Sequence, residues 1–416
     1  MGRTDSHCGQ ETLMLWPVAL ECAALGFALA PFARHRWDMR SWLKQPHQPP
    51  KEGAMEDHVV TVLLPVWNEA VVIERKLANL AEQGWPVHLY MIDSASTDAT
   101  VHLARAWLEN HPEAFLSVTI EVMETRRGKS AAVAQALTVL PQGAQDLVCM
   151  TDADALLMPE TLSRMYQWFS DPMIGAVGAL PQREHARGEE QRHRQMWEAM
   201  RIAESTIDST PFLEGSCMMW RTRLVDQTDV VVHANADDAQ VAMAVRMKGF
   251  RAVADPQALF TDVAPLNIAG QRRQKIRRGQ GLQRLLLRRR PTAGRSNMGV
   301  YGQVVRRQHH FHIVAPLLLA VAVAAGVLRW GLIAMFGWPA PSTTAGQVHL
   351  FMGVTEGTLL LAWWTSRRGR PLGPFGLLGQ WLTSMEWLLR SLLLLARGRS
   401  LHMWEQHDDE RLIKKE

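Results

Sequence analysis

A pair of aspartates separated by one residue follows a short apolar segment in the middle of the chain. The segment is Asp146–Asp152, and the pair is Asp152 and Asp154 in the string TDADA. If the segment is a strand, alternate side chains lie on one side, so both carboxylates point into one pocket. Two anions so close together repel each other unless a cation lies between or beside them. Mg²⁺ and Mn²⁺ prefer oxygen ligands and also bind diphosphates, so the pair predicts a metal site, although such a pair taken alone is more often a solvated turn.

A second acidic pair, Asp237 and Asp238, precedes a predicted helix over residues 239–248. The helix dipole favours an ionised carboxylate at this end. A general base must be ionised in order to accept the proton of a hydroxyl group. The pair is therefore a candidate base, although residue type and position also fit a simple helix N-cap.

Polar side chains also follow the other predicted strands. Asn68 and Glu69 come after the first strand, Asp93 ends the second, and Lys129 follows the third in the string RRGKS. The carboxyl ends of parallel strands meet at one edge of a sheet, where ligands bind. Together these groups suit a metal, a diphosphate and a ribose. The first strand is not followed by G-x-G-x-x-G, and the sequence has no G-x-x-x-x-G-K-[ST], which disfavours a nicotinamide enzyme and a phosphate-loop ATPase.

The elements that must position these residues alternate between strand and helix. The first strand, HVVTVLLPV, is β-branched and nearly all apolar, as expected of a buried parallel strand. Four strand–helix units in a row predict an α/β fold with a doubly wound, mostly parallel sheet. The predicted strands are residues 58–66, 88–93, 116–123 and 146–152, and the predicted helices are 69–83, 97–110, 129–140 and 159–170.

The composition indicates a water-soluble domain beside apolar segments. Hydrophobic residues make up 47% of the 416 residues and the net charge is +4, yet the mean hydropathy is −0.11. The basic residues cluster beside apolar stretches, which favours a membrane surface or a phosphate pocket over a nucleic acid. The cysteines show no C-x-x-C spacing, so neither a disulfide framework nor a zinc site is predicted.

Four apolar stretches are candidate membrane segments, namely residues 13–33, 313–336, 348–366 and 372–396. Basic residues favour the cytoplasmic side, and their positions agree with one topology for the first three stretches. The first stretch could instead be a signal peptide, but it lacks a basic leading region. The fourth carries Glu386 and Arg390, spaced to pair on one helix face, and is predicted to be either an interfacial segment or a third C-terminal span. Buried helices of a soluble protein are the alternative for all four.

Six motifs occur in an order that is typical of one enzyme family: PVWNEA, IDSASTD, RRGKSAAVAQAL, TDADA, LEGSCMMWR and ADDAQVAMAVRMKGFRAV. Over residues 58–290 the chain resembles glycosyltransferase family 2, the membrane-bound GT-A enzymes that include cellulose, chitin and hyaluronan synthases. The resemblance implies a GT-A fold, a nucleotide-sugar donor, and Mg²⁺ or Mn²⁺ held at the D-x-D motif.

The resemblance also implies roles for the matching residues on the donor side. Asp93 would contact the nucleotide base, in a pocket that Asn68 and Glu69 help to shape. Lys129 would approach the ribose or the diphosphate.

At the reacting centre, the resemblance places Asp152 near the ribose and Asp154 on the metal, with Asp152 as a further ligand. Asp238, with Asp237 beside it, matches the acidic residue that serves as the general base. The acceptor site is expected to be bordered by Glu214, Gly215 and Ser216.

One stretch departs from the family pattern. Processive members carry Q-x-x-R-W after the base, and its tryptophan stacks on the acceptor sugar. The corresponding stretch here, RRQKIRRG, keeps the positive charge but has Ile276 instead of an aromatic ring. We therefore expect Arg272, Arg277 or Arg278 to bind the diphosphate. The missing aromatic ring weakens the prediction that the enzyme holds a growing polymer. The alternative for these arginines is a solvated or lipid-headgroup face.

The sequence thus predicts a metal-dependent inverting glycosyltransferase of the hexosyltransferase class, acting at the cytoplasmic face of the inner membrane. It would move a sugar from a UDP-sugar to a lipid or saccharide acceptor. The expected organisation is a membrane helix and linker over residues 1–54, a cytoplasmic GT-A domain over 55–299, and a C-terminal membrane region with a polar tail over 300–416. The alternatives are a processive polysaccharide synthase, a polyprenyl-phosphate sugar transferase and, from another class, a nucleotide-binding membrane sensor or scaffold.

Overall fold

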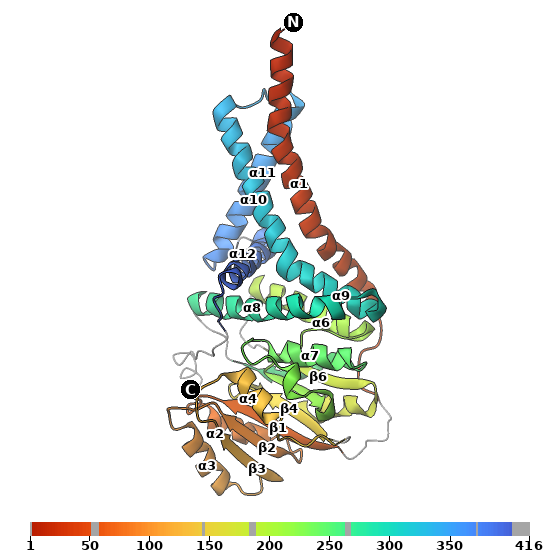
Figure 1. The fold of residues 1–416 in the computed structure, drawn as a ribbon, viewed down its shortest axis with the longest axis vertical. Coiled ribbons are helices and arrows are strands. Elements are labelled where there is room, and N and C mark those ends of the chain that lie inside the picture. Colours follow the sequence, from red (N-terminus) through yellow and green to blue (C-terminus); the bar gives the residue numbers. More distant parts are fainter. Residues whose placement is uncertain are drawn as a thin grey trace. The chain divides into compact units, whose positions relative to one another are not determined.

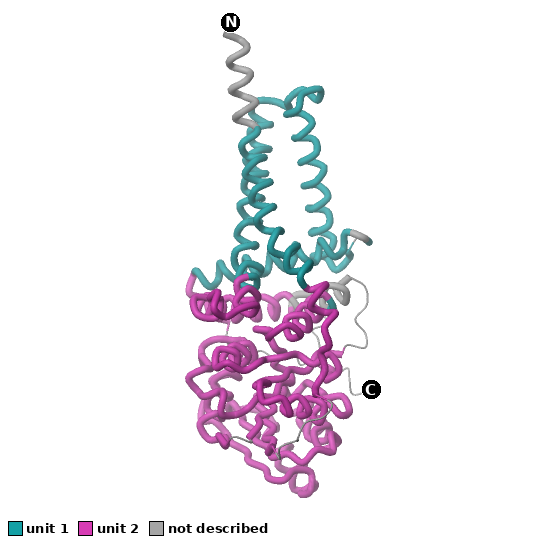
Figure 2. Tube along the Cα trace, turned by 90° about the vertical axis from the view of Figure 1, so that its right-hand side faces the viewer, with its two compact units in different colours: residues 1–38, 187–195, 307–396 teal, residues 39–186, 196–306, 397–416 magenta. Residues whose placement is uncertain are grey.

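The computed structural model describes residues 2–50, 58–143, 146–182, 189–262, 268–371 and 373–401. The end of the predicted N-terminal linker and the polar tail after residue 401 lie outside the described residues. The chain divides into two compact units, which Figure 2 shows in different colours. Unit 1 consists of Met1–Asp38, Arg187–Gln195 and Arg307–Ala396, and unit 2 of Met39–Ala186, Met196–Arg306 and Arg397–Glu416.

Unit 2 is built on one eight-stranded sheet with the order β3-β2-β1-β4-β7-β6-β8-β5. The strands β3, β2, β1 and β4 are parallel, as predicted. The other half is mixed, because β7 runs antiparallel to both β4 and β6, and β5 runs antiparallel to β8. β6 and β8 are parallel to each other, so β7 and β5 are the two described strands that run against the rest, and the prediction of a mostly parallel sheet is confirmed. The strands are β1 Val59–Val66, β2 His88–Asp93, β3 Ser117–Val122, β4 Asp146–Thr151, β5 Leu156–Leu157, β6 Ile174–Pro181, β7 Cys217–Arg221 and β8 Arg251–Thr261.

Helices cover both faces of the sheet (Figure 1). The alternation of side chains along β1 sends Val62 and Leu64 into one core and Leu63 into the other. The first core includes residues of α2 (Ile73–Ala81), α3 (Thr100–Asn110) and α5 (Thr161–Gln167), and the second includes residues of α4 (Lys129–Ala136) and α7 (Asp237–Met247). The other long helices of this unit are α8 (Ile268–Ala293), α6 (Glu189–Ile207) from Met196 onward and α9 (Gly299–His309) up to Arg306.

The helix that follows β1 begins later than the sequence predicts. Helix α2 starts at Ile73 rather than at Glu69. The backbone N–H of Glu69 donates to Thr100 Oγ1 at 2.6 Å, and that of Ala70 donates to Asp98 Oδ2 at 3.1 Å. These hydrogen bonds hold the residues after β1 in a loop, because the side chains of the neighbouring loop satisfy the donors that would begin a helix.

Unit 1 consists mainly of long helices, α1 (Gly2–Trp42), α10 (Ala315–Phe336), α11 (Thr344–Arg367) and α12 (Gly376–Ala396). Within the described residues, two helical segments are long and apolar enough to cross a bilayer, Leu15–Trp42 and Ser296–Phe336. The third and fourth predicted segments are helical but do not reach that apolar level. In α12, Arg390 Nη2 lies 2.6 Å from Glu386 Oε1, as the spacing predicts. Whether α11 and α12 span a membrane stays a prediction.

A buried ionic cluster joins three helices of unit 1. The fully buried Arg329 of α10 lies 2.5 Å from Glu356 of α11 and 3.6 Å from Glu21 of α1. Trp330 Nε1 donates to the same Glu356 carboxylate at 2.7 Å. Buried charges persist only when partners compensate them, so the cluster constrains how these helices pack.

Candidate functional site

The candidate site lies at the edge of the sheet where the parallel strands end. β1, β2, β3 and β4 all point their carboxyl ends to this edge. β7 runs the opposite way, with Cys217 opposite Thr151, so the residues just before β7 reach the same edge. The topology therefore brings the predicted donor, metal and acceptor residues together there.

The D-x-D motif forms a turn rather than the end of a strand. β4 ends at Thr151, and the N–H of Ala155 donates to the carbonyl of Asp152 at 3.2 Å. Asp152 and Asp154 are partly exposed, whereas Ala153 is buried. Both aspartates thus lie at this edge, where a turn and not strand alternation places them. That their carboxylates share one pocket stays a prediction.

Lys129, the first residue of α4, joins this turn to the start of α7. Its Nζ lies 2.5 Å from Asp152 Oδ1 and 3.6 Å from Asp237 Oδ2, and it donates to the carbonyl of Gly215 at 3.1 Å. Burial disfavours the ammonium, but the attraction of Asp152 and Asp237 raises the pKa of Lys129 above its usual value. Lys129 is therefore charged at neutral pH, and both acidic pairs meet beside it. We call Lys129, Asp152, Asp154, Asp237 and Asp238 the acidic centre.

Asp238 has the electrostatic surroundings of a base. Helix α7 begins at Asp237, and Ala236, in the left-handed conformation at φ 66°, takes the N-cap position, so neither aspartate is the cap. Asp238 Oδ1 accepts a hydrogen bond from the N–H of Ala239 at 2.7 Å. A Cβ atom at Gly215 would lie 3.0 Å from Asp238 Oδ2, so glycine permits this close approach. Burial and the charge of Asp237 raise the pKa of Asp238 to about 7, a value suited to proton transfer near neutral pH.

The loops after β1 and β2 are tied together by the predicted donor residues. The N–H of Asn68 donates to Ser96 Oγ at 2.8 Å, and the N–H of Thr97 donates to Asn68 Oδ1 at 2.7 Å. Asp93 is buried, and its carboxylate accepts hydrogen bonds from both the N–H and the hydroxyl of Ser96. Glu69 is fully buried. The contact of Asp93 with a nucleotide base stays a prediction, and the structure adds that Asp93 orders this corner.

The predicted acceptor stretch supports the D-x-D turn through its backbone. The carbonyl of Ser216 accepts hydrogen bonds from Thr151 Oγ1 at 2.9 Å and from the N–H of Asp152 at 3.2 Å. Glu214 is paired with Arg201 of α6 at 2.6 Å. This stretch therefore lies beside the acidic centre, and its role toward an acceptor stays a prediction.

The three arginines predicted to bind the diphosphate all belong to α8 but differ in their relation to the site. The backbone carbonyl of Arg277 accepts a hydrogen bond at 3.2 Å from Nδ2 of Asn235, which lies just before α7. Arg272 is partly exposed, and Ile276, in the place of the expected tryptophan, is buried. Arg278 keeps solvent exposure although much protein surrounds it. Desolvation by that protein disfavours its charge, but nearby carboxylates raise the pKa of Arg278 above its usual value, namely those of Glu214, Asp262, Asp238 and Asp152. Arg278 therefore lies within electrostatic reach of Asp238 and Asp152 of the acidic centre.

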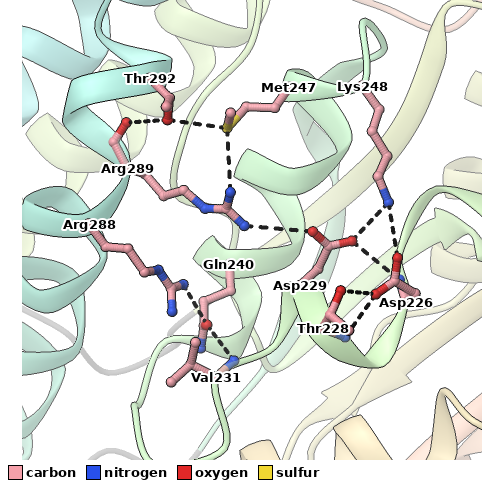
Figure 3. A network of polar contacts seen from close by, with 10 residues as sticks. All are labelled: Asp226, Thr228, Asp229, Val231, Gln240, Met247, Lys248, Arg288, Arg289 and Thr292. Carbon is pink, nitrogen blue, oxygen red and sulfur yellow. Dashed lines mark hydrogen bonds and ion pairs between the residues drawn. The ribbon is translucent and has the colours of Figure 1, made fainter.

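A polar network fixes α7 against α8 and the preceding loop (Figure 3). Gln240 Oε1 of α7 accepts hydrogen bonds from Arg288 Nη2 at 2.9 Å and from the N–H of Val231 at 2.8 Å. Asp229 lies 2.8 Å from Lys248 Nζ and 3.6 Å from Arg289 Nη2. The helix that carries Asp237 and Asp238 is thus held at both its start and its end.

Gly281 is a further constraint on this helix, and its replacement gives a test. A Cβ atom there would lie 2.8 Å from Asn235 Cβ and 3.2 Å from Ala236 Cβ. Gly281→Val should push away the loop that leads into Asp237 and lower transfer activity by about tenfold or more. Activity measured at saturating donor checks this, with the exposed Leu287→Ala of the same helix as the control. Unchanged activity in Gly281→Val would show that the close contact has no bearing on the site.

Removing Lys129 should destabilise unit 2. Lys129→Met leaves the carboxylates of Asp152 and Asp237 without their shared partner, and breaking one side of such a pair costs about 3 kcal/mol. We expect a lower thermal unfolding midpoint and no transfer activity. The double variant Lys129→Met/Asp152→Asn should recover part of the stability but not the activity, because it removes the uncompensated charge. Equal midpoints for Lys129→Met and the wild type would contradict the role of this ion pair.

Sequence reasoning missed two residues that support the site. Arg201, which pairs with Glu214, carries no local signal. Lys76 is fully buried beneath the D-x-D turn, and its signal was its position on the apolar stripe of α2 beside Ile73, Leu77 and Leu80. A charged residue on the buried face of an amphipathic helix needs a partner, which the sequence cannot identify.

The part of the chain that forms the sheet and the site is similar to known proteins. Residues 57–281 match the family model described as "Glycosyltransferase like family 2". An N-acetylglucosaminyltransferase of Rhizobium leguminosarum bv. viciae is 24% identical over 297 residues, which cover 67% of each chain. A poly-beta-1,6-N-acetyl-D-glucosamine synthase of Staphylococcus aureus is 25% identical over 241 residues, 55% of this chain and 56% of its own. The chain therefore spans little more than half the length of that relative.

A solved structure has the same fold over most of the chain. A mannosyltransferase from Pyrobaculum calidifontis, in complex with GDP-Man and Mn²⁺, is 27% identical and has a TM-score of 0.72. The match covers 92% of this chain and 100% of the other. These matches confirm the family resemblance that the six motifs indicate.

Proposed function

Because the chain belongs to glycosyltransferase family 2, we propose that it transfers a sugar from a UDP-sugar, with inversion, to a lipid or saccharide acceptor. The observation that carries this proposal is the position of Lys129, whose ammonium contacts both Asp152 and Asp237. Inverting transfer needs a bound leaving group on one side of the anomeric carbon and a base on the other. An ammonium that joins the two acidic pairs supports such an arrangement.

The donor set fits a divalent ion that enters together with a diphosphate. In the described part of the chain, no group of three or more His, Cys, Asp or Glu side chains is placed to hold a metal ion. Mg²⁺ is commonly held by one or two carboxylates together with substrate phosphates and water. Asp154 is the proposed main ligand, with Asp152 as the second, because Lys129 already engages Asp152 at 2.5 Å. When bound, Mg²⁺ or Mn²⁺ would neutralise the charge of the departing diphosphate.

The side chains of unit 2 would perform the remaining tasks. Asp238 accepts the proton of the acceptor hydroxyl as the new bond forms. Asp237 and Lys129 hold the start of α7 in place beside it. Arg278 binds the diphosphate oxygens through charge-assisted hydrogen bonds, and the site thereby keeps the donor oriented for attack.

We place this reaction at the cytoplasmic face of the inner membrane. The apolar segments Leu15–Trp42 and Ser296–Phe336 support membrane attachment. The proposed organisation keeps the membrane helix and linker at residues 1–54, the catalytic domain at 55–299 and the C-terminal membrane region at 300–416. Membrane lipids and an amphiphilic or saccharide acceptor are the corresponding partners.

Two observations favour variants of this proposal. The staphylococcal relative bears the name of a polymer synthase, which favours processive synthesis, although Ile276 replaces the aromatic residue of processive enzymes. The mannosyltransferase structure holds GDP-Man and Mn²⁺, which favours a guanosine donor. Product length separates single additions from polymerisation, and a lipid phosphate acceptor tests for a polyprenyl-phosphate transferase.

The direct test is a donor screen with the full chain purified in detergent. UDP-N-acetylglucosamine, UDP-glucose and GDP-mannose are each supplied with Mn²⁺ or Mg²⁺, and release of nucleoside diphosphate is measured. We expect turnover with a UDP-sugar that stops when the metal is chelated. Turnover with GDP-mannose and with neither UDP-sugar would show that the donor is a GDP-sugar. Binding without turnover would support a sensor or scaffold, and the absence of both would refute the proposed function.

A further inference from the structure

A buried lysine lies directly beneath the D-x-D turn. Lys76 belongs to α2, and its side chain has no exposure to solvent. Its Nζ donates to Thr151 Oγ1 at 2.8 Å and to the carbonyl of Ala155. Thr151 immediately precedes Asp152 and Ala155 immediately follows Asp154. One ammonium group therefore holds both ends of the turn.

The same contact reaches the strand on the other side. Thr151 Oγ1, which accepts from Lys76, donates in turn to the carbonyl of Ser216 at 2.9 Å. The N–H of Asp152 donates to that carbonyl at 3.2 Å. The chain of hydrogen bonds thus runs from α2 through the end of β4 to the residue before β7. Lys76 therefore lies at one end of a series of hydrogen bonds that brackets the two aspartates.

The electrostatic role of Lys76 differs from that of Lys129. Lys129 contacts the Asp152 carboxylate directly, whereas the fully buried Lys76 contacts the residues on either side of the D-x-D motif, Thr151 and Ala155. Burial lowers the pKa of Lys76 to about 8, and Cys217 and Cys149, followed by the charges of Asp152 and Asp154, act in the opposite direction. Lys76 therefore remains mostly protonated at neutral pH. Burying an ammonium costs free energy that an apolar residue of similar length would not, which points to a functional reason for a lysine here.

We propose that Lys76 is a positioning residue for the metal–diphosphate site. By holding Thr151 and Ala155, it keeps Asp152 and Asp154 at the separation that a divalent ion and a nucleoside diphosphate require. Its charge also offsets the repulsion between the two carboxylates before the ion binds. This inference rests on the proposed function, because it assumes that these carboxylates receive the ion.

The test compares Mn²⁺ and UDP binding in the wild type and in Lys76→Met, using the full chain in detergent and calorimetric titration. Partners that orient metal ligands typically contribute about 10–100-fold in affinity. We therefore expect at least about tenfold weaker binding of UDP in the presence of Mn²⁺. Higher Mn²⁺ concentrations should restore much of the donor turnover, which a general folding defect would not allow.

A matched control lies one turn further along the same helix. Asn79 Nδ2 donates to the carbonyl of Leu157 at 2.9 Å, and its Oδ1 accepts from the N–H of Leu157 at 2.8 Å. Asn79→Ala loosens the same junction between α2 and the segment after the turn, but it removes no charge and does not touch the turn. It should keep UDP affinity within about twofold of the wild type while lowering the unfolding midpoint.

A second variant keeps the test valid if Lys76→Met does not fold. Thr151→Val preserves volume but removes the hydroxyl between Lys76 and Ser216, so it should weaken Mn²⁺-dependent UDP binding in the same direction by a smaller factor. Equal affinity in the wild type and in the folded variants, or an equal loss in Asn79→Ala, would overturn the role of Lys76. If the wild type itself binds no nucleotide with either metal, the proposed function fails instead.

Discussion

Replacing Asp238 by asparagine is expected to reduce sugar transfer by about a thousandfold or more while leaving UDP and Mn²⁺ binding within a few fold of the wild type. Asparagine has nearly the same shape and can still accept the hydrogen bond from the N–H of Ala239, which is 2.7 Å long in the wild type. It cannot accept the proton of an acceptor hydroxyl. Initial rates at saturating donor, together with calorimetric titration of UDP, measure the two effects separately.

The pH dependence gives this prediction its second readout. Because burial and the charge of Asp237 raise the pKa of Asp238 to about 7, the base is protonated and inactive at lower pH. In the wild type, kcat/KM should therefore fall about tenfold for each pH unit below that value. The residual activity of Asp238→Asn should lack this acidic limb.

Asp237→Asn is the matched control for the neighbouring position. It removes the negative charge that raises the pKa of Asp238, so the acidic limb should move to lower pH. Retained full activity in Asp238→Asn, or an acidic limb that persists in it, would remove Asp238 from the role of base. The family match would remain, and the base would have to be sought elsewhere.

Replacing Asp154 by asparagine is expected to abolish metal-dependent donor binding. Asp154 is the carboxylate proposed to bind the ion most directly, because Asp152 is held by Lys129 at 2.5 Å. Loss of a direct ligand should exceed the effect of losing an orienting partner, so UDP affinity in the presence of Mn²⁺ should fall by more than about a hundredfold. In the absence of metal, the weak affinity for UDP should change little. Titrations with and without Mn²⁺ measure this difference.

Asp146→Asn serves as the control for charge and strand. Asp146 lies at the opposite end of the same strand, β4, where its Oδ2 accepts a hydrogen bond from the N–H of Gly143 at 2.6 Å. The replacement of Asp146 also removes one carboxylate from unit 2. Asp146, however, lies at the end of β4 away from the D-x-D motif, so it is not placed to bind the metal ion. If both variants lost metal-dependent binding equally, or if neither did, Asp154 would not be the ligand.

Local patterns were sufficient to identify the parallel half of the sheet. The second strand, predicted over residues 88–93, is observed as His88–Asp93, and the first and fourth differ by a single residue at one end. These strands are runs of apolar and β-branched residues bounded by polar turn residues, so their signal is contained within a few neighbours. The polar residues that follow them reach one edge because parallel strands share a direction.

The mixed half of the sheet could not be predicted from the same signals. Strand β7 is short and fully buried, and nothing in CMMWR distinguishes a parallel from an antiparallel partner. The D-x-D residues form a turn and not the end of a strand, because Lys76 and the carbonyl of Ser216 hold the chain around them. Such choices depend on partners that are distant in sequence.

The sequence by itself determined the family, the parallel strands and which acidic residues lie at their ends, since each of these depends on residue order and short-range periodicity. Tertiary structure alone decided how those residues are held. Lys76 reaches Thr151 across 75 positions of sequence, and Lys129 joins Asp152 to Asp237. Charge pairing and burial are properties of the folded chain, because they arise when packing brings distant side chains together and excludes water from between them.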